Sequence, residues 1–142
     1  MSQAFAVARA AGAHGEVPVG AVLVRAGEVV AVAGNRTIAD HDPTAHAEML
    51  VLRAGALALA SGRLGDCDLY VTLEPCTMCA AAISHARIRR LYFAAGDAKG
   101  GAVENGVRFF GAATCHHAPE VYGGIREGEA TEMLRRFFQG LR

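Results

Sequence analysis

The sequence lacks a long apolar run and a leader-like N-terminus. No apolar stretch among its 142 residues approaches the roughly 18 to 20 residues that a membrane-spanning helix needs. Residues 1–15 have no basic segment ahead of an apolar block, because Arg9 stands in their middle, so we expect an amphipathic helix and no signal peptide. These absences favour a cytoplasmic protein with no membrane partner.

An excess of charge of either sign is also missing, since 14 basic side chains balance 14 acidic ones. This balance argues against a protein that binds nucleic acid through its overall charge alone. Basic side chains nevertheless gather between residues 87 and 108, where Arg87, Arg89, Arg90, Lys99 and Arg108 outnumber Asp97 and Glu104. A local basic face is therefore compatible with the neutral sum.

Low-complexity stretches, internal repeats and linker-like segments are absent as well. Hydrophobic residues make up 52% and charged residues 20% of the chain, which is typical of a globular protein. A chain of this length usually forms one domain with a substantial core. We therefore predict a single domain over residues 1–142.

The hydrophobic pattern that is present alternates between helix and strand periods. Strands at 19–24 and 29–33, joined by a tight turn at Ala26-Gly27, predict an antiparallel hairpin. Helices are expected at 1–15, 45–60, 77–85 and 127–138, and further strands at 69–73, 91–95 and near Val121. Thr44 is the expected N-cap of the helix at 45–60. This order predicts an α/β fold with a mixed sheet and helices on its faces.

Two short motifs carry the chemistry: His46-Ala47-Glu48, and Pro75-Cys76-Thr77-Met78-Cys79. Two cysteines three residues apart at the start of a helix can coordinate one metal ion, and a helix N-terminus favours their thiolate form. One imidazole and two thiolates leave the fourth position of a tetrahedral zinc site open, as in catalytic zinc sites. The pair H-x-E and P-C-x-x-C is the signature of the zinc-dependent nucleobase deaminases.

Glu48 is the carboxylate of this set that zinc does not need. We expect it to take a proton from the zinc-activated water and to deliver protons to the ring nitrogen and the departing amine. The reaction then replaces an exocyclic amine with a carbonyl and releases ammonia.

A Cys-x-x-Cys motif by itself also fits a closed structural zinc site or a redox pair. A closed site needs a fourth ligand, which His41, His85 or the Cys115-His116-His117 cluster offers on composition alone. Pro75 and the upstream His46 and Glu48 favour the catalytic interpretation. Cys67 and Cys115 are expected to be inert thiols.

Longer blocks resemble the bacterial tRNA adenosine deaminases. These blocks stand in order at residues 15–22, 34–36, 41–48, 70–80 and 97–102, and the resemblance extends over roughly residues 5 to 140. It implies a three-layer α/β/α sandwich with a five-stranded mixed sheet, a homodimer that contacts its substrate from both subunits, and one zinc ion per subunit. The substrate implied is adenosine at the wobble position of a tRNA anticodon loop.

The resemblance also assigns roles to single residues. It implies that His46, Cys76 and Cys79 bind zinc, that Glu48 shuttles protons, and that Asn35 hydrogen-bonds the flipped-out base. Val17 and Leu73 would line the base pocket, and the loop with Asp97 and Lys99 would approach the flanking nucleotide. On composition alone, Asn35 is an ordinary loop residue, Val17 and Leu73 are core, and Asp97 and Lys99 are a solvated pair.

The predicted function is hydrolytic deamination of adenosine to inosine in a tRNA anticodon. A first alternative is a deaminase of the same superfamily that acts on a free base or nucleoside of the guanine or cytosine type. A second alternative is a non-catalytic, zinc-stabilised RNA-binding module, which fits the neutral charge poorly and leaves Glu48 without a role.

Overall fold

A computed structural model describes residues 1–141 of the chain. Its helices are α1 (Ser2–Ala13), α2 (Ala47–Ala58), α3 (Thr77–His85) and α4 (Glu127–Gln139), with a short 3-10 helix η1 (Phe109–Gly111). Its strands are β1 (Gly20–Arg25), β2 (Glu28–Gly34), β3 (Cys67–Leu73), β4 (Arg90–Ala95) and β5 (Glu120–Tyr122). Every helix and strand predicted from the hydrophobic pattern is therefore confirmed, with boundaries that shift by a few residues.

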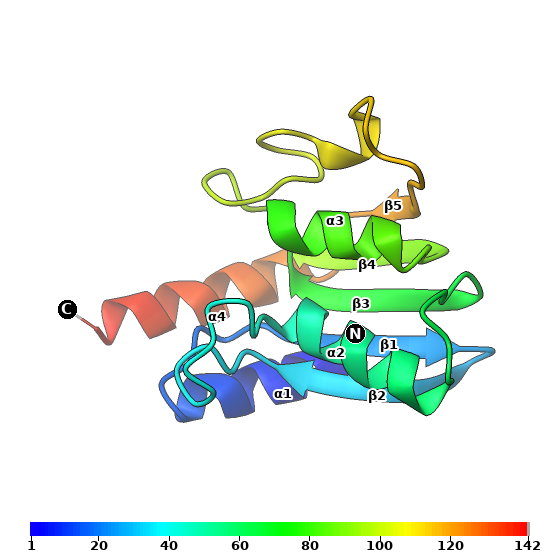
Figure 1. Cartoon of the computed structure of the whole chain (residues 1–142). Coiled ribbons are helices and arrows are strands. Elements are labelled where there is room, and N and C mark those ends of the chain that lie inside the picture. The colour runs from blue at the N-terminus through cyan, green and yellow to red at the C-terminus, as the bar shows by residue number, and fades with distance from the viewer. Residues whose placement is uncertain (142) are drawn as a thin grey trace.

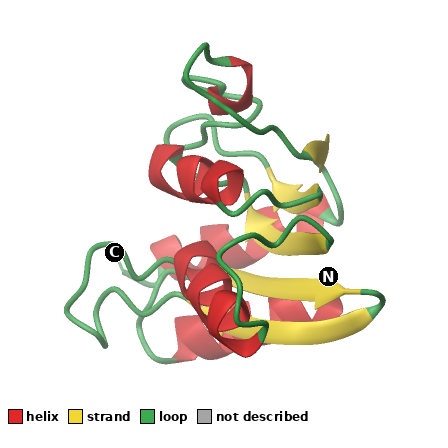
Figure 2. Cartoon of the chain, turned by 45° about the vertical axis from the view of Figure 1, so that its right-hand side comes forward, coloured by secondary structure: helices red, strands yellow, loops and turns green. Residues whose placement is uncertain are grey.

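The five strands form one mixed sheet in the order β2-β1-β3-β4-β5. Strand β1 runs antiparallel to both β2 and β3, whereas β3, β4 and β5 are parallel to one another. Helices α2 and α3 lie side by side on one face of the sheet, and α1 and α4 cover the other (Figures 1 and 2). The structure is the predicted α/β/α sandwich with a five-stranded mixed sheet.

Each face of the sheet has its own apolar core. The larger core lies under α2 and α3 and includes Leu23, Val51, Leu69, Ile83 and Phe93. The smaller one lies under α1 and α4 and contains Phe5, Ala94, Ala95 and Ala130. Close packing of α1 depends on Gly20, because a Cβ there would lie 2.0 Å from the carbonyl oxygen of Ala4.

The predicted cap of α2 is wrong. The helix begins at Ala47, so His46 and not Thr44 is its N-cap. Thr44 instead hydrogen-bonds Asp42 through both its backbone N–H and its hydroxyl, which closes a turn before the helix. Cys76 occupies the same position before α3. The N-termini of both helices therefore hold residues of the two sequence motifs.

None of the helices described between residues 1 and 141 is both long and apolar enough to cross a bilayer.

Candidate metal centre and active site

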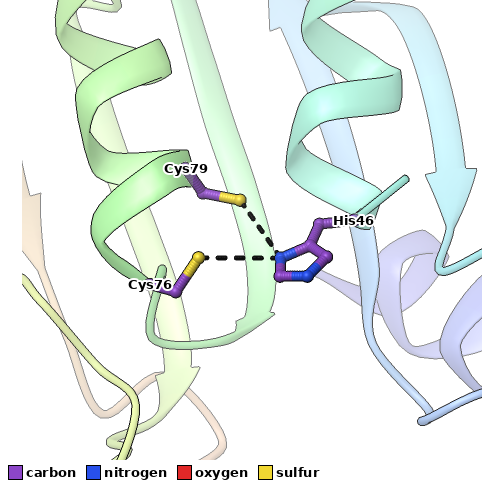
Figure 3. Close-up of side chains that lie close together, drawn as sticks. All are labelled: His46, Cys76 and Cys79. Atoms are coloured by element: carbon purple, nitrogen blue, oxygen red, sulfur yellow. Dashed lines mark hydrogen bonds between the residues drawn. The ribbon is translucent and has the colours of Figure 1, made fainter. Parts of the chain in front are cut away.

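His46, Cys76 and Cys79 form the site's centre, with ligand atoms that all lie within 4.8 Å of one another. The Nδ1 atom of His46 lies 3.6 Å from the Sγ atom of Cys76 and 3.5 Å from that of Cys79 (Figure 3). Zinc–sulfur bonds of about 2.3 Å and zinc–nitrogen bonds of about 2.0 Å at a tetrahedral angle would place nitrogen and sulfur about 3.5 Å apart. The three side chains therefore fit one zinc ion.

Hydrogen bonds among His46, Cys76 and Cys79 favour a negatively charged thiolate, which is the form that binds a cation. The hydrogen bond from the Cys79 thiol lowers the pKa of Cys76 to about 4, and the same bond raises the pKa of Cys79 above its usual range. The hydrogen bond with Cys76 raises the pKa of His46. One thiolate thus forms at neutral pH, and binding of a divalent cation displaces the remaining protons.

No fourth ligand completes this group within residues 1–141, where His46, Cys76 and Cys79 are the whole set. Two members of the Cys115-His116-His117 cluster have contacts elsewhere. His117 Nε2 lies 2.7 Å from the carbonyl oxygen of Ile88, and Cys115 Sγ lies 3.5 Å from the Ser84 hydroxyl. Burial raises the pKa of Cys67 to about 11, which fits an inert thiol. The arrangement favours an open, catalytic site over a closed one.

Glu48 lies in the first turn of α2 and is only 4% exposed. Burial raises the pKa of its carboxyl group above the ordinary value for glutamate, against a hydrogen bond with Cys79 that lowers it. Burial of this kind suits a carboxyl group that takes up a proton and returns it during a reaction. The structure thus places a buried carboxyl group beside Cys79 and outside the set of metal-binding atoms.

A cavity of about 220 Å³ opens beside these residues. Its lining includes His46, Glu48 and Cys76 together with Val17, Asn35, Leu73 and Asp97, all of which were predicted as site residues; Val19, Glu74 and Gly100 complete it. Neither Cys79, which is buried, nor Lys99, which is exposed, lines the cavity. The structure therefore brings the predicted pocket residues together, with the exception of Lys99.

Asn35 has a fixed orientation in this cavity. Its Oδ1 atom accepts a hydrogen bond of 2.9 Å from the backbone N–H of Ala47, which is the first residue of α2. The oxygen thereby satisfies a free N–H group at the helix start. The amide nitrogen of Asn35 remains as the donor for a ligand in the pocket.

Two buried glutamates near the site were missed from the sequence. Glu74 is 3% exposed, and burial opposes its ionisation, but hydrogen bonds from Asp97, Asn105 and Val103 outweigh this and lower its pKa. Glu16 is also 3% exposed and accepts hydrogen bonds from Thr37, Ile38 and Ala39. The available signal was a charged residue within an otherwise apolar or proline-flanked block, at Gly15-Glu16-Val17-Pro18 and Leu73-Glu74-Pro75.

Comparisons with known proteins agree with this geometry. Residues 1–95 match the family model for the cytidine and deoxycytidylate deaminase zinc-binding region. A tRNA-specific adenosine deaminase of Agrobacterium fabrum is 62% identical over 139 residues, which cover 98% of this chain and 91% of the relative. A structure from work on A-to-I editing by tRNA:A34 deaminases at the wobble position of transfer RNA has a TM-score of 0.92, with 62% identity over 94% of this chain and 96% of the other.

A guanine deaminase structure from Bacillus subtilis is less similar. Its TM-score is 0.65, and it is 38% identical over 67% of this chain and 61% of its own. The sequence identity to the tRNA-specific adenosine deaminases is therefore the higher of the two, and it extends over more of the chain. The chain belongs to the cytidine and deoxycytidylate deaminase family of zinc-binding proteins and, within that family, to the tRNA-specific adenosine deaminases.

Proposed function

We propose that this chain converts adenosine to inosine by hydrolysis at the wobble position of a tRNA anticodon. The observation that carries the proposal is the convergence of His46, Cys76 and Cys79 beside the buried Glu48 in a pocket of small volume. The near full-length similarity to a tRNA-specific adenosine deaminase supports the substrate. We further propose that residues 1–142 act as one domain and that the protein works in the cytoplasm, on tRNA.

His46, Cys76 and Cys79 would hold one zinc ion per chain. When bound there, zinc supplies a water molecule that ionises near neutral pH. Glu48 takes one proton from the attacking water and passes it to the adenine ring nitrogen next to the reacting carbon, while the water oxygen bonds to that carbon. Glu48 then takes the second proton from the new hydroxyl group and delivers it to the amine, so that the carbon–nitrogen bond breaks and ammonia leaves a carbonyl in its place.

The remaining pocket residues would bind the extruded base. Val17 and Leu73 offer apolar walls, and the fixed amide of Asn35 offers a donor to a ring nitrogen. Asp97 lines the cavity and Lys99 is exposed two residues further along the same loop, which supports the assignment of both to the nucleotides next to the target. Bases splayed from a single-stranded loop suit this mode of recognition.

Replacing Asn35 with Asp should separate its two hydrogen bonds. The carboxylate still accepts from the Ala47 N–H but no longer donates to the base. We expect kcat/KM on an anticodon hairpin to fall by about 100-fold because a buried base acceptor loses its partner. Zinc content and melting temperature should stay at the parent's values. A variant that keeps full activity would remove Asn35 from base recognition.

We also propose a homodimer. An apolar surface on the outer side of α2 supports it, since Leu57 is 84% exposed and lies in a hollow with Ala56 and Ala60. Exposed apolar patches of this kind commonly mark protein interfaces. Light scattering of the purified protein should give about twice the chain mass of 14.8 kDa. A mass of one chain at micromolar concentration would contradict the dimer.

One experiment tests the proposed function directly. The purified protein is incubated with an anticodon stem-loop that carries adenosine at the wobble position, and separately with free adenosine, guanine and cytosine. Mass spectrometry follows the replacement of an amine by a carbonyl oxygen. Conversion of the hairpin alone supports the proposal. Turnover of a free base without turnover of RNA would identify a free-base deaminase, and zinc binding without any turnover would identify a binding module.

A further inference from the structure

The carboxylate of Glu74 lies at the centre of a network that none of the roles above uses. Its Oε1 atom accepts hydrogen bonds from the backbone N–H of Asp97 at 2.9 Å and from the side-chain amide of Asn105 at 2.7 Å. Its Oε2 atom accepts from the backbone N–H groups of Val103, Glu104 and Asn105, at 3.0, 2.9 and 3.0 Å. One buried carboxylate therefore ties both ends of the loop at 97–105.

This network connects the loop with the metal-binding segment. Glu74 stands between Leu73, which lines the pocket, and Pro75-Cys76, which leads into α3. A further hydrogen bond of 2.9 Å joins the Ala102 N–H to the Pro75 carbonyl oxygen. The loop follows β4, at the top of Figure 1, and both this loop and the segment that leads into α2 contribute residues to the lining of the pocket. The two segments flank the pocket that holds Asn35 and Asp97.

The absence of a side chain at Gly101 allows the loop to pack against the Glu74 carboxylate. A Cβ atom at this position would lie 2.4 Å from the carboxyl carbon of Glu74 and 2.5 Å from the Asp97 carbonyl oxygen. The backbone of Gly101 is not in the left-handed region, so any side chain is opposed by the closeness of these atoms and not by the backbone angle. Only a residue without a side chain lets the loop close over the Glu74 carboxylate.

We propose that Glu74 is a positioning residue that holds the 97–105 loop as the substrate-facing wall of the pocket, and that it thereby sets the affinity for the RNA loop. This proposal rests on the proposed function. Asp97 and Gly100 lie on the tied loop and line the cavity, so loss of the network displaces the wall that faces the substrate. The metal-binding side chains have their own contacts with one another and keep their places.

The first test replaces Glu74 with Gln, which has the same shape. A glutamine has one acceptor oxygen and points its NH₂ group at N–H donors, so the five hydrogen bonds cannot all form. We expect KM for the anticodon hairpin to rise by about 10-fold to 100-fold, while kcat changes less than about threefold. Binding of the hairpin in a Glu48→Ala background should weaken by the same factor. Zinc content should remain that of the parent.

Hydrogen exchange gives a readout on the free protein. The amides of Val103, Glu104 and Asn105 donate to Glu74, so we expect them to exchange faster in Glu74→Gln, while the amides of β3 and α3 do not change. A merely structural role would instead speed exchange throughout the sheet.

The second test disrupts the contacts of the Glu74 carboxylate by a substitution in the loop. Gly101→Ala should raise KM as Glu74→Gln does, and the double variant should be no worse than the worse single one, because both remove one network. Gly111→Ala is the matched control, since a Cβ there meets nothing within 4 Å and its backbone angle is ordinary. We expect this control to behave as the parent.

Four results would overturn the proposal: loss of zinc in Glu74→Gln, a fall in kcat at unchanged KM, additive effects of Glu74→Gln and Gly101→Ala, or unchanged exchange at residues 103–105. A parent protein that is inactive on the hairpin would refute the proposed function instead. The exchange comparison would then still decide whether Glu74 holds the loop.

Discussion

Replacing Glu48 with Ala should slow deamination of the anticodon hairpin by about 1,000-fold and leave zinc near one ion per chain. Glu48 is buried, burial raises its pKa, and it lies outside the set of atoms that could hold the metal. Loss of a general acid–base group typically costs 100-fold to 10,000-fold in rate. The decrease should be in kcat and not in the affinity for the hairpin, because the carboxyl group transfers protons during the reaction and does not hold the base in the pocket.

Glu48→Gln refines this experiment, because it keeps the shape and the hydrogen-bonding capacity of the side chain but cannot carry the proton. It should be nearly as slow as Glu48→Ala. Glu28→Ala, at an exposed acid of the β1–β2 hairpin, is the control and should retain parental activity. Single-turnover rates by mass spectrometry and zinc by atomic emission measure the outcome. Loss of zinc together with activity would make Glu48 a ligand and contradict its assignment as the proton carrier.

Much of the architecture could be predicted because local patterns determine it. The alternation in β3 places Leu69 and Val71 in one core, and the tight turn at Ala26-Gly27 fixes the hairpin. The metal centre could be predicted for a different reason. Few residue types bind zinc, and a spacing of three places Cys76 and Cys79 on one side of a helix start, which the structure has at α3.

The rest depends on contacts between residues distant in sequence. Threonine is a residue type that commonly caps helices, which is why Thr44 was predicted as the N-cap. Asn35, which follows β2, instead accepts a hydrogen bond from the Ala47 N–H, and α2 begins at Ala47, later than predicted. Glu74 gains its role from donors 23 to 31 positions away. A local pattern contains no information about such partners. The positive charge of the predicted basic cluster is likewise partly neutralised by acidic residues distant in sequence, since Arg89 forms a salt bridge with Asp68 and Arg90 forms one with Glu120.

The second large effect is expected from removing a zinc ligand, and a second fully buried cysteine provides a matched control. Cys79 and Cys67 are both 0% exposed, but only Cys79 lies beside His46. Replacing Cys79 with Ala should reduce zinc to below about a tenth of an ion per chain, because two remaining ligands bind zinc too weakly to survive purification. Activity on the hairpin should be lost with it. Cys67→Ala should retain zinc and activity.

Stability should follow the metal and not the sulfur atom. An ion present at about 1,000 times its dissociation constant stabilises the folded chain by about 4 kcal/mol, or about 10 °C for a domain of this size. Cys79→Ala should melt about 10 °C below Cys67→Ala, which shares its packing cost, and a strong chelator should lower the melting temperature of the parent by a similar amount without lowering that of Cys79→Ala. Cys67→Ala loses a buried sulfur of equal size, so its melting temperature reports the packing cost alone and should still fall when the chelator is added. Equal losses in the two variants, with no response of the parent to chelator, would mean that Cys79 is a core residue and that the catalytic metal lies elsewhere.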